Sequence, residues 1–82
     1  ELSQERRVEF VKIAKKMAED GRVAIRHVRR DAMDQIKKHA HDSGVTEDDQ
    51  KKAEKELQKL TDAHIAKIDT HLANKEKEIM TV

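Results

Sequence analysis

Apolar residues recur along the first half of the chain at intervals of three and four, the spacing of one face of an α-helix. The spacing repeats every eleven residues rather than every seven, which indicates a nearly straight helix or slight right-handed coiling. Ser3 suits an N-cap, so we predict a helix over about residues 3–42, close to 60 Å long. Its predicted apolar face consists of Phe10, Ala14, Met17, Gly21, Ile25, Val28, Ala32 and Ile36.

The segment His41-Asp42-Ser43-Gly44 ends this pattern, with Gly44 suited to a left-handed C-cap. Thr46 then suits a new N-cap, so we predict a turn at 43–46 and a second helix over about residues 47–79. Because the connection is so short, the two helices must run antiparallel. The predicted fold class is therefore all-α, a helical hairpin. The buried stripe expected on the second helix consists of Ala53, Leu57, Leu60, His64, Ile65, Ile68, Leu72 and Ile79.

The apolar face of the first helix is wider than one partner helix can cover, since it extends as far as Ile13 and Ala24. A third helical surface is therefore expected. It comes either from another segment of a parent protein, giving a three-helix bundle, or from a second copy, giving a four-helix bundle. For the isolated chain we predict self-association. Gly21 either marks the close approach of a neighbouring backbone or is merely tolerated at a cost of about 1 kcal/mol.

The composition narrows the class of protein. With 82 residues the chain forms one domain at most, too small for a large catalytic cleft. Charged residues make up 43% of the chain and proline is absent, which favours helix. The formal net charge is only +1, so any basic function must be local. The lack of cysteine excludes disulfide and thiolate chemistry.

No apolar run reaches membrane-spanning length and no signal-peptide pattern opens the chain, so we expect a soluble cytoplasmic protein with no membrane partner. The first residue is Glu1 rather than Met, which suggests a fragment of a longer protein. The five histidines lack the i, i+4 spacing beside a carboxylate that a helical metal site needs, and His64 is expected to be a packing residue. No nucleophile with a neighbouring base is evident either. We therefore expect no metal, no cofactor and no enzymatic activity.

Arginines cluster on one side of the first predicted helix, in the segment RVAIRHVRR. At about 100° per residue, four of them share an arc separate from the apolar face. They are Arg22, Arg26, Arg29 and Arg30. Arginine stays charged at neutral pH and grips phosphate oxygens two at a time, so the arc is a candidate RNA-binding face. The alternative is a solvated face whose arginines are screened by Glu19, Asp31 and Asp34.

Four long segments carry a resemblance to a known family. They read LSQERRVEFVK, AEDGRVAIRHVRRDAMDQIKK, SGVTEDDQKKAEKELQKLTDAHIAKID and LANKEKEIM. In this order they resemble the C-terminal part of bacterial ribosome recycling factor, over essentially all 82 residues. The resemblance implies the second and third helices of an elongated three-helix bundle. It also implies that the first helix, and a small β-rich domain inserted after it, are absent from this chain. That first helix would be the third surface required above.

The resemblance further implies a role in translation termination. Proteins of this family lie on the RNA of the large ribosomal subunit, and their inserted domain faces elongation factor G, which drives the splitting of the ribosome. The family's arginine-rich face maps onto Arg22, Arg26, Arg29 and Arg30, with Arg29 at its centre. Without the inserted domain the chain is expected to bind but not to recycle. Two alternatives remain: a structural hairpin or coiled coil for self-association or partner binding, and a general nucleic-acid binder.

Overall fold

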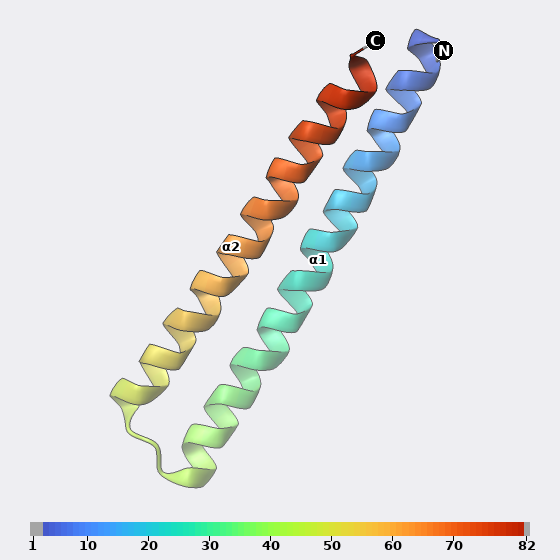
Figure 1. The fold of residues 1–82 in the computed structure, drawn as a ribbon. Helices are drawn as coiled ribbons and strands as arrows, with labels where there is room; N and C mark the ends of the chain where they lie inside the picture. The colour runs from blue at the N-terminus through green and yellow to red at the C-terminus, as the bar shows by residue number, and fades with distance from the viewer. Residues whose placement is uncertain (1–2, 82) are drawn as a thin grey trace.

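The computed structural model describes residues 3–81, and these form two long antiparallel helices joined by a tight turn (Figure 1). Helix α1 spans Gln4–Ser43 and helix α2 spans Glu47–Met80. Together they form a rod with principal extents of 62 × 15 × 10 Å. The predicted fold class, an all-α helical hairpin, is confirmed.

Local chemistry accounts for the helix ends. The hydroxyl of Ser3 accepts a hydrogen bond from the backbone N–H of Arg6 at 3.3 Å, and the hydroxyl of Thr46 accepts one from Asp49 at 3.2 Å. Both are N-caps, which satisfy backbone donors that lack a partner in the first turn. Gly44 closes α1 with φ +68°, a left-handed conformation that favours glycine because it has no Cβ. The reversal is therefore encoded within a few residues.

Helix α2 packs along one edge of the predicted apolar face of α1, not along its centre. This edge includes several small residues as well as larger ones. The buried or partly buried positions of α1 are Arg7, Val11, Ala14, Ala18, Gly21, Arg22, Ile25, Arg29, Ala32, Met33, Ile36 and Ala40. Those of α2 are Gln50, Glu54, Leu57, Thr61, Ile65, Ile68, Leu72, Glu76 and Ile79.

Three of the predicted core positions on α1 are wrong for this hairpin. Phe10, Met17 and Val28 are exposed, Met17 to 69% and Val28 to 66%. They lie on the far flank of the apolar face, which a single partner helix does not reach. The expectation that two helices bury only one flank of this face therefore agrees with the structure.

The stripe predicted on α2 is likewise shifted. Ala53, Leu60 and His64 are exposed, so the expectation that His64 packs in the interface is wrong. Thr61 takes part in the interface instead and is only 5% exposed. Its hydroxyl donates to the carbonyl oxygen of Leu57, one turn earlier, at 2.8 Å. Because this hydrogen bond lies within the helix, burying the hydroxyl leaves no unsatisfied polar group.

Arg7 is buried at the open end of the hairpin, although the apolar pattern gave no reason to place an arginine there. Arg7 is only 8% exposed, and its Nη1 donates a hydrogen bond to the carbonyl oxygen of Met80 at 3.3 Å. The negative C-terminal end of the α2 dipole also stabilises a cation at this position. Arg7 thereby ties the start of α1 to the end of α2.

Candidate nucleic-acid interface

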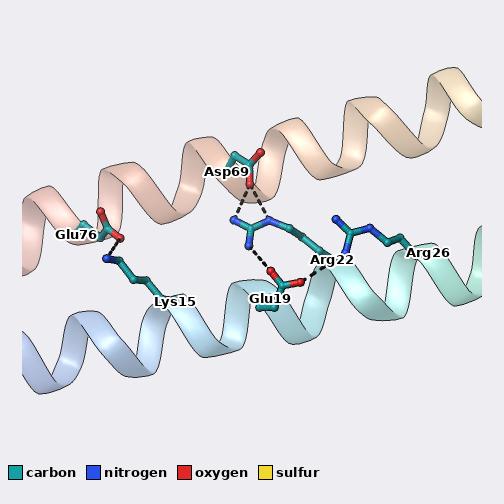
Figure 2. A network of polar contacts seen from close by, with 6 residues as sticks. All are labelled: Lys15, Glu19, Arg22, Arg26, Asp69 and Glu76. Carbon is teal, nitrogen blue, oxygen red and sulfur yellow. Dashed lines mark hydrogen bonds and ion pairs between the residues drawn. The ribbon is translucent and has the colours of Figure 1, made fainter.

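Arg22 lies between two carboxylates at the contact of the helices (Figure 2). Its Nε and Nη2 atoms donate to Oδ1 of Asp69 on α2 at 2.8 Å and 2.6 Å, and Nη1 contacts Oε2 of Glu19 at 3.1 Å. The side chain is only 18% exposed. This arrangement joins α1 to α2 and leaves little of the guanidinium to a ligand.

The hydrogen bond to Asp69 is the main cause that raises the pKa of the Arg22 guanidinium, and Glu19 adds to it. A raised pKa in the folded state means that the ion pair stabilises the hairpin at neutral pH. On the alkaline side this stabilisation is lost as the pH rises through that raised pKa, far above neutrality. The contact is therefore constant over the pH range of the cell.

Other cations in the same half of the rod also have carboxylate partners. Nη1 of Arg26 lies 3.5 Å from Oε1 of Glu19, and the Arg26 side chain is 47% exposed. Lys15 on α1 lies 3.9 Å from Glu76 on α2, as Figure 2 shows. Glu19 thus serves both Arg22 and Arg26, as the screening alternative expected of it.

Towards the turn, the arginines form no ion pair with a carboxylate of residues 3–81. Arg29 is partly buried at the helix contact, and its Nη1 donates to the neutral amide oxygen of Gln58 on α2 at 3.4 Å. Arg30 is exposed, and its side chain takes part in no hydrogen bond or ion pair within residues 3–81. Neither guanidinium is paired with a carboxylate of these residues.

The four predicted arginines therefore share one side of the rod but differ in what they offer. Arg22 is committed to two carboxylates, Arg26 shares one of them, and Arg29 and Arg30 are not neutralised. The helical wheel found the shared side, because Arg22, Arg26, Arg29 and Arg30 all belong to α1. The helical wheel could not show the role of α2. Asp69 and Gln58 face Arg22 and Arg29 only because of the register in which the two helices pack.

An apolar groove lies on the other side of the hairpin, towards its open end. It is formed where the exposed flank of α1 meets α2, and its floor contains the small residues Ala14, Ala18 and Gly21. The larger side chains along it include Phe10, Ile13, Met17, Ile68, Leu72 and Ile79. This groove is the uncovered part of the wide face that the sequence indicated.

Two further features of the described helices bear on function. Within residues 3–81, no three His, Cys, Asp or Glu side chains lie close enough together to hold a metal ion. Neither α1 nor α2, as far as the structure describes them, has the length and apolar character needed to cross a membrane.

The family model described as Ribosome recycling factor matches residues 1–80. The chain is 61% identical over all 82 residues to the ribosome-recycling factor of Rhodopseudomonas palustris strain TIE-1, of which it covers 44%. It is 58% identical over 81 residues, 99% of its length, to that of Oleidesulfovibrio alaskensis, again covering 44% of the relative. The chain thus spans less than half the length of these relatives, and it belongs to the ribosome recycling factor family.

Proposed function

We propose that this chain is a ribosome-binding helical part of a ribosome recycling factor and that it contacts RNA of the large ribosomal subunit through the arginine side of α1. Arg22, Arg26, Arg29 and Arg30 form the predicted site. Arg29 and Arg30 are its leading members, because neither forms an ion pair with a carboxylate of residues 3–81. Membership of the family supports the ribosome as the target.

The side-chain chemistry supports phosphate recognition rather than base reading. Guanidinium groups bind phosphate oxygens, and the chain has a single aromatic residue, Phe10, which lies in the apolar groove. Stacking on unpaired bases therefore has no platform on the arginine side. A rigid helical rod such as this hairpin can lie along the backbone of a structured RNA. Proteins recognise such RNA mainly by its shape and through phosphate contacts.

The test is the salt dependence of binding between the purified chain and isolated large ribosomal subunits. Four phosphate contacts would give a slope of log affinity against log salt of roughly −3. Replacing Arg29 and Arg30 by Gln should weaken binding and make this slope less steep by about two. Binding to an unrelated duplex RNA, measured in parallel, separates ribosomal recognition from general nucleic-acid binding.

A matched control is Arg6→Gln with Lys38→Gln. These two cations are exposed on α1 and lie at least about 80° round the helix from each of the four arginines, and removing them changes the net charge by the same amount. The control variant should bind as the unchanged chain does. Equal binding by the Arg29/Arg30 variant and the control, or a slope near zero for the unchanged chain, would overturn the proposal.

The wider activity of the family rests on more than these residues. We propose that elongation factor G acts through the inserted domain that the family resemblance implies, so that these 82 residues bind the subunit without splitting ribosomes. The first helix implied by the same resemblance would cover the apolar groove. The cytoplasm, where ribosomes work, is the corresponding location.

We also infer that the isolated chain self-associates through the apolar groove. Exposed Phe10, Ile13 and Met17 on one side of this groove would remain in water in a single hairpin, and burying them is favourable by about 25 cal/mol per Å². Light scattering should therefore give a mass of at least twice 9.5 kDa, and a mass of 9.5 kDa would contradict this inference. A structural role alone is the weaker alternative, since family membership already accounts for the chain.

A further inference from the structure

We propose that the phosphate-binding surface continues from α1 onto α2, where Lys51 and Lys55, together with Lys37 of α1, bind backbone phosphates of the same RNA as Arg29 and Arg30. This inference rests on the proposed function and deepens it, because it makes RNA binding a property of both helices. The arginine-rich segment gave no indication of these three lysines.

The register of the hairpin brings the lysines to the arginines. Arg29 donates to Gln58, so the two helices are level at this point. Since they run antiparallel, Lys37, eight residues after Arg29, lies level with Lys51, seven residues before Gln58. Lys55 precedes Gln58 by three residues and therefore shares its face of α2. The cations thus flank the contact line of the helices on one side of the rod.

Two hollows in the surface agree with this placement of the lysines beside the arginines. One hollow is lined by Arg29, Arg30 and Lys37 of α1 and by Glu54 of α2. The hollow next to it shares Glu54 with the first and is otherwise lined by Asp48, Asp49, Lys51, Lys52, Lys55 and Gln58. The two hollows together form a basic trough across the helix contact, in the half of the rod nearest the turn.

Charge compensation separates this half from the other. In the half drawn in Figure 2, carboxylates partner Lys15, Arg22 and Arg26. In the trough, the structure gives no ion pair or hydrogen bond to the side chains of Lys37, Lys51 and Lys55 within residues 3–81. A polyanion gains most where the cations are not already neutralised, since it has no internal ion pair to break.

Four acids line the trough and lower its charge without cancelling it. Glu54 is partly buried between the helices and accepts a hydrogen bond from the Gln50 amide at 3.4 Å. Asp34 lines the first hollow, and Asp48 and Asp49 line the second. Against these four stand six cations, which are Arg29, Arg30, Lys37, Lys51, Lys52 and Lys55, so the local balance stays positive although the whole chain is nearly neutral.

The experiment compares paired lysine variants on α2. Lys51→Gln with Lys55→Gln removes two charges from the trough, whereas Lys67→Gln with Lys77→Gln removes two from exposed positions of α2 turned away from α1. Binding of each chain to isolated large ribosomal subunits is measured across a salt series, and circular dichroism verifies equal helicity. The trough variant should make the slope less steep by about two, and the control variant should leave it unchanged.

A second comparison uses neighbouring residues. Lys37→Gln should weaken binding and make the slope less steep by about one. Lys38 points about 100° away from Lys37 on the helix, so Lys38→Gln should change neither. If the trough lysine variants bind like their controls while the Arg29/Arg30 variant is weakened, the extension onto α2 is wrong and the proposed function stands. If the arginine variant also binds like its control, both are wrong.

Discussion

Gly21 offers the sharpest test of how the two helices pack. It lies in the middle of α1, partly buried, and a Cβ built on it would lie 3.4 Å from Cδ1 of Ile68 on α2. That is an ordinary contact distance, and the atom it meets is the end of a flexible side chain. No backbone atom of α2 lies within 4 Å of that Cβ position. Within the hairpin, glycine at this position is therefore tolerated rather than required.

Replacing Gly21 by Ala should accordingly stabilise the hairpin. Glycine in a helix interior costs about 1 kcal/mol relative to alanine, chiefly because the unfolded chain is freer. After allowing for a small adjustment of Ile68, we expect a gain of about 0.5–1 kcal/mol in the free energy of unfolding. For a chain of this size that corresponds to a rise in Tm of roughly 2–8 °C.

The assay is thermal unfolding followed by far-ultraviolet circular dichroism, at one fixed low protein concentration because self-association makes Tm depend on concentration. Ala24→Gly is the matched control, since Ala24 is an exposed position of the same helix. It should lower the free energy of unfolding by about 1 kcal/mol. A lower Tm for Gly21→Ala would mean that α1 and α2 approach more closely at this level than the Ile68 distance allows, and would refute the reasoning.

Two further predictions concern the turn and the groove. Gly44→Ala places a Cβ on a residue with φ +68°, so it should lower the free energy of unfolding by about 1–2 kcal/mol; an unchanged denaturant midpoint would show that the turn rearranges at little cost. Phe10→Ser with Met17→Ser should reduce the mass found by light scattering towards 9.5 kDa without loss of helicity, because both side chains are exposed in the hairpin and line the groove. The same change made at exposed Val23, away from that groove, should leave the mass unchanged.

The sequence by itself determined the elements of this protein and their order. The apolar spacing specified two helices, and the caps at Ser3, Gly44 and Thr46 specified where they start and stop, because these depend on neighbours a few residues apart. The short turn then left only an antiparallel hairpin. The shared side of the four arginines also followed from helical geometry alone.

Only the tertiary structure decided which edge of α1 is covered and which charges are free. A wide apolar face allows several placements of α2, and packing covered the edge that contains Ala14, Ala18 and Ile25, leaving Phe10 and Met17 exposed. That choice set the register, which brought Asp69 to Arg22 but only an amide to Arg29. Such pairings join residues about 30 to 50 positions apart, and the local pattern of a helix carries no information about them.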